Sequence, residues 1–92
     1  MNILFSRTAW EQYLTWQRED AKLLTRINDL LKAIQREPFA GIGKPEPLRQ
    51  NLKGFWSRRI NGEHRLVYRV VGKDSKTQRI EVIACRFHYG QK

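Results

Sequence analysis

The sequence predicts a small α+β domain in which two N-terminal helices pack on a twisted, mainly antiparallel sheet of about four strands. Three observations support this class. Apolar residues recur at helical spacing across residues 7–34, residues 55–69 alternate in the pattern of a β-hairpin, and residues 78–89 form a last alternating strand. Because 92 residues are enough for one hydrophobic core, we expect a single domain over residues 1–92.

The formal net charge of +9 favours a polyanionic partner, because a basic field raises the rate of encounter with nucleic acid or an anionic membrane. Nucleic acid is the favoured partner. No apolar run approaches the ~20 residues of a membrane span and no secretion signal is evident, so we expect a soluble, cytoplasmic protein without a membrane partner. Cys85 is the one cysteine, and its apolar neighbours predict a small core residue in a reducing cytosol rather than a reactive thiol.

A short apolar run at residues 3–5 has the length of a strand, and the first helix follows it over residues 7–18. Ser6 or Thr8 can cap this helix, and Thr8 with Glu11 three residues later fits a capping box. The apolar side chains recur at roughly helical spacing. We therefore expect the aromatic residues of this helix to lie in the core rather than to stack on a ligand.

The second helix is the element that the sequence predicts most directly. Asp20 is a suitable N-cap, and Pro38 ends the helix because proline cannot continue it. The charged residues of the opposite face form a solvated surface or, alternatively, an edge that follows a phosphate backbone. The apolar positions follow the helical repeat throughout and are Leu23, Leu24, Ile27, Leu30, Leu31 and Ile34.

Residues 55–69 alternate between bulky and basic side chains on either side of Asn61 and Gly62. This dipeptide predicts a two-residue turn with positive φ values, and hence a hairpin. Guanidinium groups match the geometry of phosphate, so a sheet rich in arginine favours a polyanion. The arginines of the hairpin and of the strand predicted beside it are Arg58, Arg59, Arg65, Arg69 and Arg86.

The connection at residues 39–54 is rich in glycine and proline but lacks the pattern of a phosphate-binding loop. Glu46 lies between Pro45 and Pro47, which restrict the backbone on both sides. We therefore expect a carboxylate on a stiff segment beside many cations. The alternative is a solvated surface charge, which is the usual role of a glutamate in a loop.

The chain has two histidines and one cysteine, none at ligand spacing, so the sequence predicts neither a metal site nor another cofactor. Carboxylate, imidazole and guanidinium groups are nevertheless sufficient to cleave RNA. Such cleavage needs a base for the 2′-OH, a cation for the phosphate and an acid for the leaving 5′-oxygen. Glu46 is the candidate base, and Arg65, with Arg59 near it, is the candidate phosphate clamp. His88 is the candidate acid or, alternatively, a histidine without a role near the chain end. His64 beside the turn is expected to be structural or exposed.

The motifs that distinguish this sequence are WxxYLxWQ from residue 10, KPEPL from residue 44, FWSRRI, EHRLVY and the closing ACRFHY at residues 84–89. With these motifs over nearly the whole chain, the sequence resembles the YoeB toxins of the RelE superfamily. The resemblance implies a RelE-like, microbial-ribonuclease-like fold and a type II toxin that cleaves mRNA in the ribosomal A site. It places the catalytic residues at Glu46, Arg65, His88 and Tyr89, and we expect phosphate ligands at Lys44, Arg49, Arg59 and Arg86.

The resemblance also implies partners for the chain. These are a cognate, YefM-like antitoxin with an acidic and hydrophobic tail, the ribosome and its mRNA, and a second copy of the chain in a homodimer. Three features depart from the family pattern: residues 90–92 follow the closing tyrosine, the turn at residues 72–77 is longer, and Arg49 stands where lysine is common. The alternative function is a non-catalytic basic module that acts by occupying the ribosome or nucleic acid.

Overall fold

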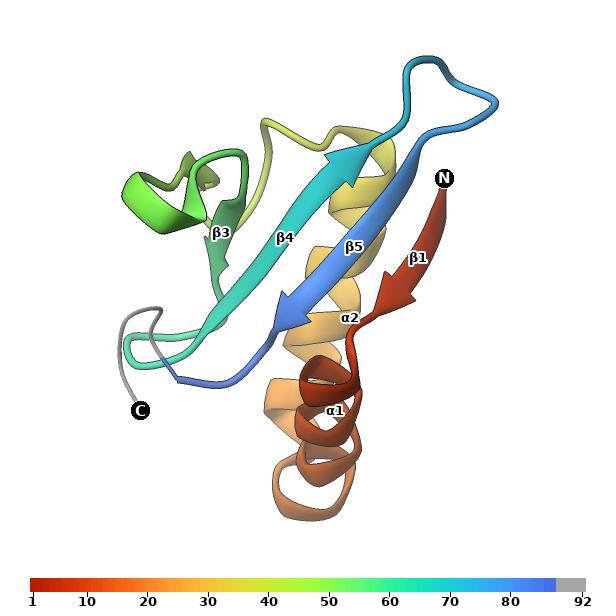
Figure 1. Ribbon diagram of the computed structural model, residues 1–92. Coiled ribbons are helices and arrows are strands. Elements are labelled where there is room, and N and C mark those ends of the chain that lie inside the picture. The colour runs from red at the N-terminus through yellow and green to blue at the C-terminus, as the bar shows by residue number, and fades with distance from the viewer. Residues whose placement is uncertain (88–92) are drawn as a thin grey trace.

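Both helices lie against one face of a five-stranded sheet in the computed structural model, which describes residues 1–87 (Figure 1). The strands follow the order β1-β5-β4-β3-β2, with β1 parallel to β5 and the other neighbouring pairs antiparallel. In chain order the elements are β1 (Asn2–Phe5), α1 (Arg7–Glu19), α2 (Ala21–Arg36), β2 (Glu46–Pro47), a 3-10 helix η1 (Gln50–Leu52), β3 (Trp56–Arg59), β4 (Arg65–Val71) and β5 (Arg79–Ala84).

The predicted α+β class is confirmed. The sheet gains a fifth strand because the two residues of β2 pair with β3, inside the segment that the sequence predicts as a connection. Neither α1 nor α2 combines the length and the apolar character that crossing a membrane requires.

The helices begin at predicted caps. Of the two candidates for α1, Ser6 is confirmed: its Oγ accepts a hydrogen bond from the N–H of Ala9 at 3.1 Å, so α1 begins at Arg7 and Thr8 already lies in its first turn. The capping box predicted at Thr8 is therefore wrong. Asp20 caps α2 by accepting from two backbone N–H groups, and α2 ends before Pro38, as predicted.

The predicted hairpin is confirmed, but its turn is wrong. Arg59 of β3 pairs with Arg65 of β4, which leaves a five-residue loop at 60–64. Neither Asn61 nor Gly62 has a positive φ. Instead, Asn61 Oδ1 accepts hydrogen bonds from the backbone N–H groups two and three residues on, at 2.9 and 2.7 Å. An asparagine side chain that bonds its own backbone in this way replaces the two-residue turn.

The last strand is shorter than predicted, because β5 ends at Ala84 rather than near residue 89. Side chains of α1 bind both backbone groups of the next residue. The N–H of Cys85 donates to Gln12 Oε1 at 2.8 Å, and its carbonyl accepts from Trp16 Nε1 at 2.8 Å. These bonds replace the ladder, so the predicted alternation of faces stops there.

The hairpin divides its side chains between the two faces of the sheet. Arg58, Leu66 and Tyr68 are fully buried, and the latter two belong to the core that includes Ile27 and Leu30 of α2. We call this side the helix-covered face. The alternate residues point to the opposite side, which we call the helix-free face, and in β3 and β4 these are Ser57, Arg59, Arg65, Val67 and Arg69.

Candidate functional site

Strand register places three of the predicted site residues on the helix-free face. Arg59 pairs with Arg65, and Glu46 of β2 pairs with Ser57, two residues before Arg59. Directly paired residues in neighbouring strands share a face, and so do residues two apart along one strand. Glu46, Arg59 and Arg65 therefore project from the same side of the sheet, where they combine a carboxylate with two guanidinium groups.

Backbone hydrogen bonds hold the segment of Glu46 at both ends. The N–H of Arg59 donates to the carbonyl of Gly43 at 2.7 Å, and the N–H of Leu48 donates to the carbonyl of Phe55 at 2.9 Å. Between these bonds the two prolines restrict the backbone. The exposed side chain of Glu46 is thus carried by a segment fixed on the adjacent strand.

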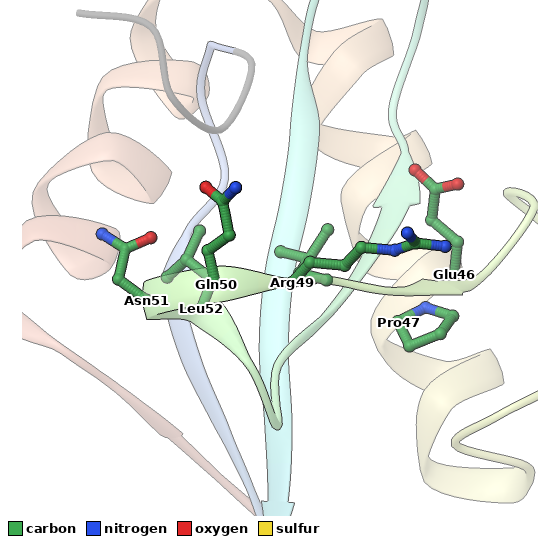
Figure 2. A pocket seen from close by; sticks show the side chains of 7 residues that line it. Glu46, Pro47, Arg49, Gln50, Asn51 and Leu52 are labelled. Carbon is green, nitrogen blue, oxygen red and sulfur yellow. The ribbon is translucent and has the colours of Figure 1, made fainter.

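Residues 46–52 line an open depression of about 600 Å³ beside this carboxylate. Figure 2 shows that the Arg49 side chain extends along the segment toward Glu46. Leu48 is buried and Leu52 is half-buried, whereas residues 49–51 are exposed, so the two leucines anchor the loop. The depression is therefore lined by both apolar and charged residues.

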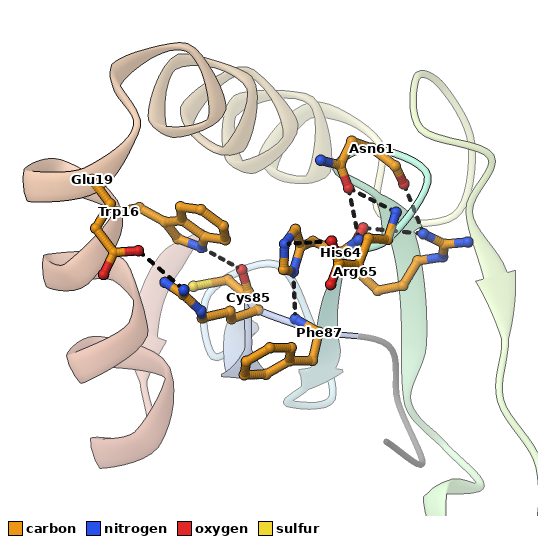
Figure 3. A network of polar contacts seen from close by, with 9 residues as sticks. Trp16, Glu19, Asn61, His64, Arg65, Cys85 and Phe87 are labelled. Carbon is orange, nitrogen blue, oxygen red and sulfur yellow. Dashed lines mark hydrogen bonds and ion pairs between the residues drawn. The ribbon is translucent and has the colours of Figure 1, made fainter. Parts of the chain in front are cut away.

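Arg65 is held in place by the loop of the hairpin. Only 9% of the residue is exposed, and its Nη1 donates to the carbonyl oxygens of Asn61 at 2.8 Å and His64 at 3.1 Å (Figure 3). Within residues 1–87, none of the ion pairs includes Arg65. A nearly buried cation with uncharged acceptors is stabilised by an anionic ligand, because burial has removed much of its hydration.

The other predicted phosphate ligands differ in their surroundings. Lys44 and Arg49 are exposed on either side of Glu46. Arg86 instead contacts α1, since its Nη2 donates to the carboxylate of Glu19 at 3.0 Å and its guanidinium carbon lies 4.4 Å from the ring centroid of Trp16. The sequence predicts one role for the three cations, but the fold presents two of them to solvent and holds the third against a helix.

The sequence predicts that the hairpin arginines form one polyanion-binding surface, and for Arg58 this prediction is wrong. It is fully buried on the helix-covered face. Its Nε donates to the Tyr68 hydroxyl at 3.1 Å, and its terminal nitrogens donate to three carbonyl oxygens of the loop after α2. These acceptors are Ile42 at 3.1 Å, Glu37 at 2.7 Å and Ala40 at 2.8 Å. Arg58 therefore organises the loop that leads to β2.

His64 is buried, which excludes the exposed alternative. Its Nδ1 accepts a hydrogen bond from the backbone N–H of Phe87 at 2.7 Å (Figure 3). The predicted catalytic residues His88 and Tyr89 follow Phe87 directly and lie outside the described residues. The part of the site that the structure describes thus contains the candidate base and the candidate clamp.

The family model that matches this chain is the YoeB-like toxin of bacterial type II toxin–antitoxin systems, over residues 5–89. The chain is 57% identical over 89 residues to Toxin YoeB of Synechocystis sp., a match that covers 97% of this chain and 98% of that one. Its identity to Toxin YoeB of Escherichia coli (strain K12) is 51% over 89 residues, covering 97% of this chain and 100% of the relative.

Solved structures of similar sequence have the same fold. The YoeB/ParE toxin from Agrobacterium tumefaciens superimposes with a TM-score of 0.91 at 53% identity, covering 97% of this chain and 100% of that one. Two structures from Staphylococcus aureus each cover 97% of this chain and 98% of their own. They are a YoeB dimer, with a TM-score of 0.84 at 48% identity, and a heterotetrameric YoeB–YefM toxin–antitoxin complex, with 0.83 at 49% identity.

Proposed function

Because this chain belongs to the YoeB-like toxin family of bacterial type II toxin–antitoxin systems, we propose that it is an endoribonuclease that cleaves mRNA in the ribosomal A site and so stops translation. The observation that carries this proposal is the register that aligns Glu46, Arg59 and Arg65 on the helix-free face. A pure binder of RNA gains nothing from a carboxylate among its cations, because the carboxylate repels phosphate. A nuclease needs it as a base.

The proposed reaction requires only groups of the chain and of the RNA. Glu46 takes the proton of the 2′-OH, and the 2′-oxygen attacks the neighbouring phosphorus. The bond from phosphorus to the 5′-oxygen breaks, and His88 donates a proton to that oxygen. The products are a 2′,3′-cyclic phosphate and a 5′-OH. No metal ion takes part, and Tyr89 is assigned to the same site by the motif that it shares with the family.

Arg65 is suited to stabilise the charge that develops on the phosphate. Two loop carbonyls orient its guanidinium, so little reorganisation is needed when the reaction begins. Arg59 is exposed on the same face and adds a second cation. We assign Lys44 and Arg49 to the phosphates that flank the scissile bond, because both are exposed beside Glu46. Arg86 differs, because Glu19 and Trp16 already contact its guanidinium. Its role as a phosphate ligand therefore stays a prediction.

The partners proposed for this chain follow from its relatives. The relative from Staphylococcus aureus forms a complex with YefM and also a dimer. We propose a cognate YefM-like antitoxin, whose acidic and hydrophobic tail covers the helix-free face, and a homodimer of the toxin. The ribosome and its mRNA are the proposed targets. We also propose that the protein acts in the bacterial cytoplasm as a single domain over residues 1–92.

Glu46→Gln tests the proposal, because it keeps the size of the side chain and removes the base. We expect the variant to sediment with ribosomes as well as the parent, and its single-turnover cleavage of ribosome-bound mRNA to fall by about 100-fold or more. Glu11→Gln is the matched control, since it removes the same charge from the exposed surface of α1. It should cleave at the parent's rate.

Three results would contradict the proposal. Equal cleavage by Glu46→Gln and the parent would remove Glu46 from the mechanism. Arrest of translation by the parent without any cut mRNA would instead identify a basic module that acts by occupancy. Mapping the RNA ends distinguishes a third outcome, because 5′-phosphate products would indicate attack by water rather than by the 2′-OH.

A further inference from the structure

Phe87 has a backbone conformation that few side-chain-bearing residues adopt. Its φ of 65° lies in the left-handed region, where a Cβ atom is crowded by the backbone. A residue is held in such a conformation only when its surroundings determine it. The surroundings of Phe87 must therefore supply specific contacts.

Those contacts come from two consecutive residues of the hairpin. The N–H of Phe87 donates to His64 Nδ1 at 2.7 Å, and its carbonyl accepts from the N–H of Arg65 at 3.0 Å. Both backbone polar groups of Phe87 are thus bound by His64 and Arg65, and we call this contact the Phe87 clamp. The same Arg65 carries the guanidinium proposed to stabilise the phosphate.

His64 is itself held by two aromatic rings and by a hydrogen bond of its backbone. Its ring packs edge-on against Trp16 with centroids 4.8 Å apart and lies 5.7 Å from the ring of Phe87. Its backbone N–H donates to Asn61 Oδ1 at 2.7 Å. Since Nδ1 accepts a hydrogen bond, the ring hydrogen is on Nε2, which lies 3.6 Å from a carboxylate oxygen of Glu63.

We propose that His64 is a positioning residue of the cleavage site, which acts through the Phe87 clamp on the proton donor that follows in the chain. This inference rests on the proposed function, in which His88 protonates the leaving oxygen. Phe87 directly precedes the proposed acid in the sequence. Within residues 1–87, the Nδ1 of His64 accepts the hydrogen bond of the Phe87 N–H, so we expect its loss to disturb the residue that precedes the acid while the binding cations stay in place.

Two substitutions separate the acceptor atom from the ring. His64→Phe keeps an aromatic ring against Trp16 but has no acceptor. His64→Asn loses the ring but keeps an acceptor, because Asn Oδ1 is as many bonds from the backbone as His Nδ1. Hydrogen exchange of the Phe87 amide, followed by NMR, reports on the clamp directly and needs no activity.

We expect His64→Phe to speed exchange of the Phe87 amide by about tenfold or more. Its single-turnover rate at saturating ribosomes should fall by about 10- to 100-fold, as for a misplaced catalytic group, with ribosome binding unchanged. His64→Asn should restore most of the amide protection and most of the rate, even though it loses the packing against Trp16. A residue that is merely structural would show the reverse order, because the ring and not the acceptor would matter.

The inference is overturned if His64→Phe keeps a protected Phe87 amide, or if it keeps the parent's rate. Should His64→Phe fail to fold, the ¹⁵N shifts of His64 in the parent decide: a hydrogen on Nδ1 overturns the inference, and a hydrogen on Nε2 alone supports it. Failure of the proposed function is a separate result, since it appears as an uncut mRNA in the parent whatever the exchange of Phe87.

Discussion

Arg58 and Arg59 are neighbours in β3, yet the two faces of the sheet give them opposite roles. Arg58 on the helix-covered face is fully buried and donates to four oxygen atoms. Arg59 on the helix-free face is exposed. Its backbone is hydrogen-bonded, but within residues 1–87 its guanidinium makes no hydrogen bond or ion pair. The comparison shows that strand alternation, rather than residue type, decides which arginine holds the fold and which is available to phosphate.

The helix-covered face should tolerate substitution least. Arg58→Met keeps a long apolar stem but leaves the three loop carbonyls and the Tyr68 hydroxyl without their donor. Removing one member of a buried polar network leaves its partners unsatisfied, so we expect the free energy of unfolding to fall by about 3–5 kcal/mol. Urea denaturation followed by tryptophan fluorescence measures this loss.

Tyr68→Phe is the graded control for Arg58→Met. It removes only the hydroxyl, which accepts from Arg58 and donates to the carbonyl of Pro38 at 2.6 Å. We expect a smaller loss of about 1–3 kcal/mol. If the free energy of unfolding of Arg58→Met lies within about 0.5 kcal/mol of the parent's value, the proposed role of Arg58 in the loop is wrong.

Cys85 gives a smaller effect that appears only at alkaline pH. Burial raises the pKa of its thiol from 9.0 to about 12, so the folded protein keeps the proton while the unfolded chain loses it. The stability from this group is complete below pH 9 and is lost as the pH rises toward 12. We expect the parent to lose about 1.4 kcal/mol per pH unit in this range relative to Cys85→Ala.

Unfolding free energies of the parent and Cys85→Ala at pH 8 and pH 10 measure the difference, and the variant corrects for the titration of lysine and tyrosine. A constant difference between the two proteins would mean that Cys85 ionises as readily in the folded state. It would also weaken the view that this end of β5 is sealed by α1.

The sequence predicts the elements whose signals are local. The caps and the apolar repeat of α2 lie within one segment, and both are confirmed. The end of β5 is not predictable in this way, because Gln12 and Trp16, some 70 residues earlier, bind the backbone of Cys85. The hairpin turn is missed since Asn61 can supply either a positive φ or a side-chain acceptor, and only the folded loop selects between them.

The site shows the same division. Glu46 and Arg65 can be selected from residue chemistry, because few residue types can act as a base or a phosphate clamp. The burial of Arg58 is missed, although its place two residues from Trp56 and from Ile60 puts it on an apolar side of the strand. The role of His64 has no sequence signal, since it depends on contact with Phe87, 23 residues later.

Arg59→Met is the most direct test of the division between the two faces, because it removes the exposed neighbour of the buried Arg58. Ribosome affinity should be measured over a range of salt concentrations, together with the free energy of unfolding. We predict a free energy of unfolding within about 0.5 kcal/mol of the parent's value. We also predict that the slope of log affinity against log salt becomes smaller by about 0.7, which is the share of one single-strand phosphate contact. An unchanged salt slope, or a loss of stability as large as that of Arg58→Met, would contradict the account.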